Sequence, residues 1–110
     1  MRRLFALSAL LAATSLVAAA GEWQGYIIDS TCVVRLRDKV AGHRTKCAIA
    51  CFKSGYGLLT SEGNFVKFDE TGNAKALEAL RGTSKDQDLT AKVTGTLQGE
   101  VIKVDSITIQ

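Results

Sequence analysis

The stretch LTAKVTGTLQGEVIKVDSITI, residues 89–109, decides the fold, because apolar and polar side chains alternate on both sides of a short turn. One face of its first strand is formed by Leu89, Ala91, Val93, Gly95 and Leu97. The dipeptide Gln98-Gly99 then predicts a tight turn, since glycine readily takes the positive φ that a two-residue hairpin requires. Alternation with a period of two around such a turn predicts a β-hairpin.

In the returning strand of this hairpin, the apolar side chains switch from one face to the other partway along. Ile102 and Val104 share one face, whereas Ile107 falls on the opposite face. A bulge or sharp bend at Asp105-Ser106 would account for the change. Because such bulges help a sheet to curl, the pattern favours a barrel.

The rest of the chain predicts three more strands and one helix. They are a strand over residues 22–29 with a bend point at Gly25, a hairpin of residues 56–60 and 64–69, and a helix capped by Thr71 or Asn73 and ended by Gly82. The order is strand, cysteine-bearing insert, two strands, helix, two strands. We therefore predict a mainly β domain, a five-stranded OB-like barrel with a helical insert between its first two strands. An open α+β sheet is the alternative.

The first twenty residues have the features of a cleavable export signal. Two arginines precede an apolar run over residues 4–17, and Ala18-Ala19-Ala20 supplies the small-x-small pattern that signal peptidase accepts. The run is shorter than the roughly 20 residues that span a bilayer. We expect a signal peptide over residues 1–20, an OB-like domain over residues 21–110 without a transmembrane segment, and a periplasmic or secreted bacterial protein.

Basic residues are concentrated in the insert. Without the signal peptide the chain has 12 Lys and Arg against 11 Asp and Glu, but residues 32–53 hold six of these basic residues against Asp38 alone. An anionic partner could meet this segment at Arg35, Arg37, Arg44 and Lys46. Solvated loop residues explain the same charges, and the chain has no specific nucleic-acid motif.

Three cysteines, Cys32, Cys47 and Cys51, bring an odd number of thiols into an oxidising compartment. A disulfide from Cys32 to either of the others would close a loop of roughly 15 to 20 residues and stabilise the domain by roughly 3 kcal/mol. A bridge between Cys47 and Cys51, one helical turn apart, would need distortion. A single disulfide would leave one of the three cysteines as a free thiol.

Metal binding is the alternative use of these residues. Cys32, Cys47, Cys51 and, as a fourth ligand, His43 would suit Zn or Cu. This requires a helix that begins after His43, with Thr45 as its cap, because a continuous helix would spread the ligands too far along its axis. A thiol redox protein is a second alternative, although Cys-x-x-x-Cys lacks the usual Cys-x-x-Cys spacing.

Three segments together resemble a family of small exported bacterial proteins of uncharacterised function with an OB-like domain. They are Gly25-Tyr26-Ile27-Ile28-Asp29-Ser30-Thr31-Cys32, Cys47-x-x-x-Cys51 with Lys53-x-Gly55, and KVTGTLQGEVIKVDSI over residues 92–107. The resemblance implies export and the OB-like fold and brings no established activity. Since no catalytic motif is present, we expect an exported binding or interaction module of unknown ligand, stapled by one disulfide involving Cys32.

Overall fold

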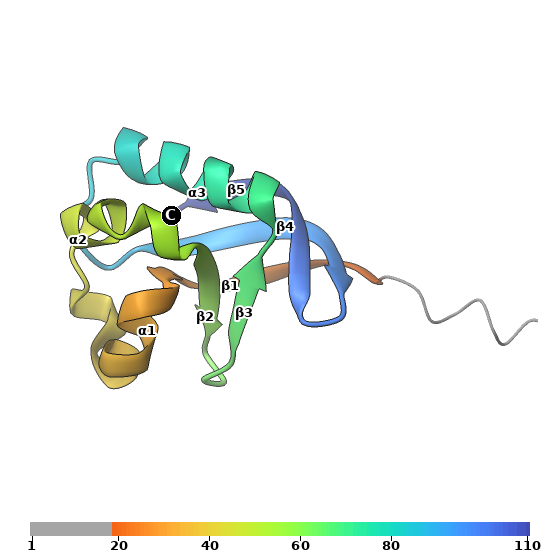
Figure 1. The fold of residues 1–110 in the computed structure, drawn as a ribbon, viewed down its shortest axis with the longest axis horizontal. Coiled ribbons are helices and arrows are strands. Elements are labelled where there is room, and N and C mark those ends of the chain that lie inside the picture. The colour runs from red at the N-terminus through yellow and green to blue at the C-terminus, as the bar shows by residue number, and fades with distance from the viewer. Residues whose placement is uncertain (1–18) are drawn as a thin grey trace, which may run out of the picture.

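Five strands close into a barrel in the computed structural model, which describes residues 19–110 (Figure 1). The strands are β1 (Ala19–Asp29), β2 (Tyr56–Thr60), β3 (Phe65–Phe68), β4 (Thr90–Gln98) and β5 (Val101–Ile109). Their order around the barrel is β1-β2-β3-β5-β4, and only the β3–β5 pair is parallel. The predicted OB-like barrel is confirmed, and the sheet is closed rather than open.

The predicted signal peptide, residues 1–20, lies outside the described residues except for Ala19 and Ala20, which begin β1. Among residues 19–110, no helix is both long and apolar enough to cross a membrane.

Strand β1 closes the barrel because it pairs with two neighbours. It is antiparallel to β4 from Ala19 to Tyr26 and to β2 from Gly25 to Asp29. The two ladders overlap at Gly25 and Tyr26. A Cβ atom on Gly25 would lie 2.3 Å from the carbonyl oxygen of Leu59. Glycine is therefore required at this point for the backbones to approach each other.

The closing hairpin contains the predicted bulge. Thr94 pairs with Ser106 and Gly95 with Val104, so Asp105 is the extra residue. The turn lies one residue later than predicted: its loop is Gly99 and Glu100, with Gly99 at φ 66°. A positive φ at the first loop residue is what a type II′ hairpin needs.

Helix α3 (Glu70–Gly82) packs against β5 and covers the barrel beside the short β3–β5 contact (Figure 1). The predicted caps, Thr71 and Asn73, are wrong. Asp69 begins the helix instead, because its side chain accepts a 2.9 Å hydrogen bond from the N–H of Gly72. The side chain of Asn73 accepts the N–H of Tyr56, at 2.8 Å, and so ties α3 to β2.

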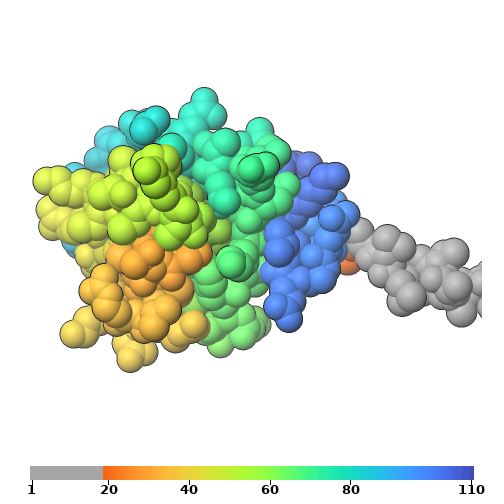
Figure 2. Space-filling model, viewed as in Figure 1, coloured from red at the N-terminus to blue at the C-terminus, as the bar shows by residue number. Residues whose placement is uncertain are grey.

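The insert between β1 and β2 is helical, as predicted. Its elements are α1 (Ser30–Leu36), the 3₁₀ turn η2 (Arg37–Gly42), α2 (Thr45–Ala50) and the 3₁₀ turn η3 (Phe52–Ser54). Figure 2 shows these residues, coloured orange to yellow-green, massed at one end of the barrel. Apolar residues of α1 pack on the outer face of β1 and β2, around Ile28, Val33 and Leu59, in a small core separate from the barrel interior.

Helix α2 begins differently from the prediction. Thr45 is its first residue rather than its cap, and Arg44 at the cap position makes no side-chain hydrogen bond to the helix. The hydroxyl of Thr45 donates instead to the carbonyl of Lys85, at 2.7 Å. A tertiary contact with the loop before β4 has thus replaced the local cap.

Candidate metal centre

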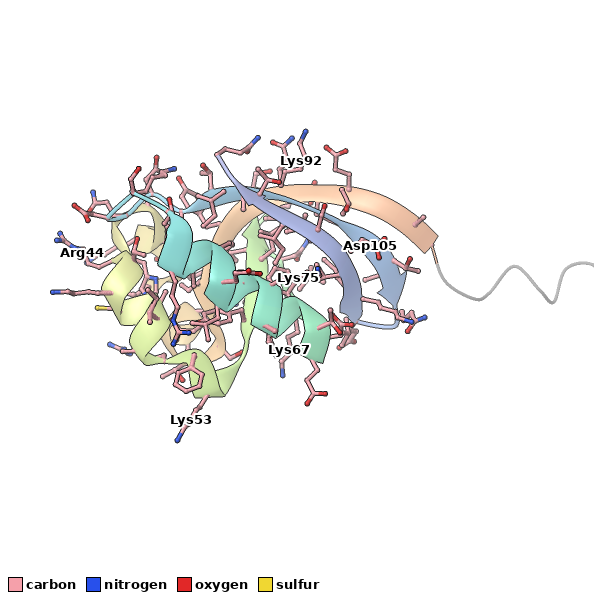
Figure 3. All side chains as sticks on the ribbon, turned by 90° about the horizontal axis from the view of Figure 1, so that it is seen from above. Arg44, Lys53, Lys67, Lys75, Lys92 and Asp105 are labelled. Carbon is pink, nitrogen blue, oxygen red and sulfur yellow. The ribbon has the colours of Figure 1, made fainter. Side chains whose placement is uncertain are left out.

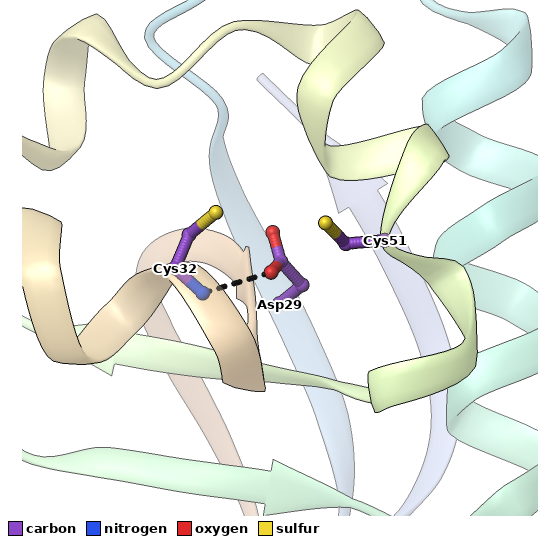
Figure 4. Close-up of side chains that lie close together, drawn as sticks. All are labelled: Asp29, Cys32 and Cys51. Carbon is purple, nitrogen blue, oxygen red and sulfur yellow. Dashed lines mark hydrogen bonds between the residues drawn. The ribbon is translucent and has the colours of Figure 1, made fainter.

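Asp29 is the last residue of β1 and is completely buried. Its Oδ2 atom accepts a 2.9 Å hydrogen bond from the backbone N–H of Cys32, which makes Asp29 the N-cap of α1 (Figure 4). The carboxylate therefore fixes the first turn of the helix that carries Cys32. Its other oxygen, Oδ1, remains for a different contact.

Two sulfur atoms lie on either side of this carboxylate (Figure 4). Cys32 comes from α1 and is buried, whereas Cys51 follows α2 as its C-cap and is half-buried. One ligand atom each from Asp29, Cys32 and Cys51 lie within 4.8 Å of one another. Three residues from two separate helix ends and one strand end thus converge on one point.

His43 approaches the same carboxylate. It is 4% exposed, and its Nε2 atom lies 3.3 Å from Asp29 Oδ1. The contact lacks the alignment of a hydrogen bond, so neither ring nitrogen of His43 nor Asp29 Oδ1 has a hydrogen-bond partner among residues 19–110. Buried polar atoms without partners are rare because each costs about 1–3 kcal/mol. These three atoms therefore mark a place where a further polar or cationic group would be favourable.

The segment that carries His43 is clamped to the loop between α3 and β4. The N–H of Thr45 donates to the carbonyl of Asp86 at 2.7 Å, and the N–H of Asp88 donates to the carbonyl of Ala41 at 2.8 Å. Together with the Thr45 hydroxyl, these bonds hold the chain on both sides of the histidine. His43 itself is extended, with φ −69° and ψ 124°, so α2 begins after it, as a shared site requires.

Burial favours the uncharged forms of Cys32 and His43 in the absence of a cation. Burial raises the pKa of the Cys32 thiol to about 11, and the charges of Asp29 and Cys51 act in the same direction. Burial also lowers the pKa of His43, although Asp29 opposes that shift. Cys32 is therefore a thiol and His43 a neutral imidazole at neutral pH. The Arg35 guanidinium supplies a nearby positive charge, with Nη2 3.7 Å from Cys32 Sγ.

The structure brings together three of the four residues proposed from sequence. Cys32, Cys51 and His43 gather around Asp29, whereas Cys47 is exposed and lies outside the cluster. All three cysteines are free, so the predicted disulfide from Cys32 is not formed here. Sequence reasoning missed Asp29. Its position three residues before Cys32, between a strand and a helical turn, is an N-cap pattern that could have drawn attention to it.

The residues predicted to meet an anionic partner, Arg35, Arg37, Arg44 and Lys46, are all exposed. Arg37 donates from Nη1 to the carbonyl of Gly63 at 2.5 Å and so links the insert to the β2–β3 turn. An open cleft of about 710 Å³ adjoins this contact on the outer face of β1 and β2, lined in part by Tyr26, Val40 and Leu59. None of the metal donors lines the cleft.

Comparisons of the chain with protein-family models, with curated protein sequences and with solved structures give no match. The geometry, burial and charge of the donor residues are therefore what point to a function.

Proposed function

We propose that the domain binds a zinc ion through Asp29, Cys32, His43 and Cys51. The observation that carries the proposal is the convergence of two sulfurs and a buried carboxylate within 4.8 Å, beside a buried imidazole with two unpartnered nitrogens. Zn²⁺ takes tetrahedral sets of sulfur, nitrogen and oxygen ligands of this kind. Cu⁺ prefers softer, all-sulfur sets, and Mg²⁺ or Ca²⁺ prefers all-oxygen sets, so the mixed donors favour zinc.

The spacing of the donors fits a metal better than a covalent bond. With Zn–S bonds of about 2.3 Å, two sulfurs on a tetrahedral ion lie about 3.8 Å apart. The donor atoms of Asp29, Cys32 and Cys51, separated by up to 4.8 Å, would need to close by roughly 1 Å, which small side-chain rotations supply. A disulfide needs about 2.05 Å, so the two sulfurs would have to move considerably further.

The local charges also suit a divalent cation. Two thiolates, one carboxylate and a neutral histidine around Zn²⁺ leave a single negative charge. Arg35, whose Nη2 lies 3.7 Å from Cys32 Sγ, offsets it. Zinc would also release the Cys32 proton, because a coordinating thiol is deprotonated. The buried cluster would then contain no unpaired charge.

Titration of the reduced protein with Co²⁺, a coloured substitute for zinc, tests this proposal. We expect thiolate-to-cobalt charge-transfer absorption that saturates at one ion per chain and is reversed by zinc. Cys51→Ser should abolish the charge-transfer band or weaken binding at least about tenfold, and His43→Gln should weaken it comparably. Cys47→Ser is the matched control and should leave the affinity unchanged. Binding that survives Cys51→Ser, or that requires Cys47, would contradict this ligand set.

A second candidate is an exported interaction module stapled by a Cys32–Cys51 disulfide. It is supported by the proximity of these two sulfurs and by the predicted oxidising compartment. Intact mass after alkylation of unfolded, unreduced protein distinguishes the two. One alkylated thiol, at Cys47, supports the staple, whereas three alkylated thiols together with a bound zinc in native mass spectra support the metal site.

A further inference from the structure

The three cysteines differ in exposure in a regular order. Cys47 is exposed, Cys51 is half-buried and Cys32 is buried, with Asp29 completely buried beyond it. The proposed zinc site uses the two inner cysteines and leaves Cys47 without a role. The exposure of the three cysteines nevertheless falls from solvent toward the buried donors.

Cys47 and Cys51 are positioned to share an ion. The N–H of Cys51 donates to the carbonyl of Cys47 at 3.2 Å, the bond that places two residues one helical turn apart. Side chains at this spacing lie on the same helix face, with Cβ atoms about 5–6 Å apart. A thiolate at Cys47 can therefore approach a metal held by Cys51 through rotation of its own side chain.

The surface around Cys47 is positively charged. Arg44 and Lys46 precede it in sequence by three residues and one residue, and both are exposed, as is Lys53. Figure 3 shows Arg44 and Lys53 projecting away from the barrel on the insert. Such a surface attracts anions and raises their local concentration, and a zinc ion outside a protein is commonly held in an anionic complex with carboxylate or thiolate ligands.

Building on the proposed zinc site, we propose that Cys47 is a transfer ligand that passes zinc between anionic carriers and the buried donors. The Cys47 thiol loses its proton to solvent as its sulfur binds zinc and displaces one carrier ligand. Cys51 and then Cys32 bind next, and each loses its proton to solvent and displaces one further carrier ligand. Asp29 displaces the last carrier ligand. His43 then binds as the Cys47–zinc bond breaks, and the Cys47 sulfur takes a proton from solvent. No electron is transferred in any step.

The rate of zinc exchange, measured apart from affinity, tests the role of Cys47. Zinc-loaded protein is mixed with excess 4-(2-pyridylazo)resorcinol, and the absorbance of the zinc–dye complex is followed with time. We expect Cys47→Ser to slow transfer at least about tenfold while its equilibrium zinc affinity stays within about threefold of wild type. Ala50→Ser, an exposed position of the same helix, is the matched control and should change neither quantity.

The possible outcomes separate the transfer role from the site itself. Transfer that is equally fast in Cys47→Ser overturns the role of Cys47. A loss of affinity above about tenfold in that variant also overturns it, because Cys47 would then be a permanent ligand. Absence of zinc binding by wild type overturns the site, and the transfer role with it.

A second experiment tests the positive surface around Cys47. The double variant Arg44→Ser with Lys46→Ser should take up zinc more slowly than wild type from the anionic zinc–nitrilotriacetate complex at low salt. Unchanged uptake would contradict anionic carriers.

Discussion

Asp29 caps the helix that carries Cys32, since its Oδ2 atom accepts the backbone N–H of Cys32 at 2.9 Å. The same carboxylate presents Oδ1 to His43, at 3.3 Å from Nε2. One buried side chain therefore orients one proposed ligand and faces another. The two oxygens can be tested separately because asparagine, which is also a good N-cap, keeps the first role and loses the charge.

Asp29→Asn should weaken zinc binding at least about tenfold while leaving the metal-free domain as stable as wild type or more so. The metal-free variant should keep its stability because it no longer buries a carboxylate whose Oδ1 has no hydrogen bond. Chelator competition and urea unfolding measure the two effects. Asp29→Ala is the comparison and should lose a further ~1 kcal/mol, because it also removes the cap. Retained zinc affinity in Asp29→Asn would remove this residue from the ligand set.

Tyr56→Phe should destabilise the metal-free domain by about 1–3 kcal/mol. The buried hydroxyl of Tyr56 donates to the carbonyl of Ala48 at 2.7 Å, and the variant leaves that carbonyl without its partner. Urea unfolding at pH 7 gives the difference directly. A Tyr56→Phe domain as stable as wild type would show that this bond between barrel and α2 contributes nothing.

The same tyrosine predicts a loss of stability in alkali. Burial raises the pKa of Tyr56 to about 12, with the charges of Asp29 and Cys51 acting in the same direction, against an ordinary value of 10.0. The protonated form is thus favoured by folding. Its contribution is complete below pH ~10 and is lost as the pH rises from about 10 to 12, by roughly 1 kcal/mol per pH unit. The stability difference between wild type and Tyr56→Phe should shrink over that range in unfolding curves; a constant difference would contradict the shift.

Gly25→Ala should destabilise the barrel by several kcal/mol, because its Cβ atom would lie 2.3 Å from a backbone oxygen of the paired strand. Gly42→Ala is the matched control. A Cβ atom there meets nothing within 4 Å, so that variant should be neutral or stabilising by under about 1 kcal/mol. Thermal unfolding of both variants gives the comparison, and equal melting temperatures would show that β1 and β2 can separate at this point at no cost.

Thr45→Val should weaken zinc binding by several-fold and lower stability by about 1 kcal/mol. Valine keeps the volume but removes the hydroxyl that donates to Lys85, which helps to hold the segment carrying His43. Thr31→Val, at an exposed position of α1, is the control for the substitution itself. An effect on stability alone would mean that the backbone bond from Thr45 to Asp86 suffices to place the histidine.

The signal peptide proposed from the sequence predicts that protein recovered from the periplasm begins at Gly21, as intact mass would show. Cleavage there removes only two residues of β1, Ala19 and Ala20, whose partners are at the outer end of β4. The remaining pairs with β4 and all pairs with β2 should therefore persist. A recovered chain that retains residues 1–20 would argue against a cleavable signal.

The sequence predicted the barrel well because the alternation of apolar and polar residues is a local property of each strand. Even the bulge at Asp105 follows from parity alone, since a shift of one residue moves every later side chain to the other face. The caps were predicted less well. Asp69 rather than Thr71 or Asn73 begins α3, because Asn73 is engaged by β2, a contact that no local pattern reveals.

The candidate site was predicted in part for a related reason. The cysteines and the histidine are conspicuous as residue types, but their grouping depends on how the insert folds over the end of β1. Cys47 and Cys51 share a helix face, yet only Cys51, the more buried of the two, lies close to Asp29. Asp29 itself is an ordinary residue in sequence. Its importance comes from complete burial beside unpartnered atoms, which is a tertiary property.

The hydrogen bonds that hold the chain around His43 have a consequence for the order of assembly. Ala41 and Thr45 are fixed by Asp88, Asp86 and Lys85, residues about forty positions later in the chain. Docking of this distant loop therefore fixes the segment that places the histidine beside Asp29. In zinc fingers the metal drives a short peptide to fold. Here zinc would instead bind to a domain that has already folded, so an incompletely folded chain would bind the ion weakly.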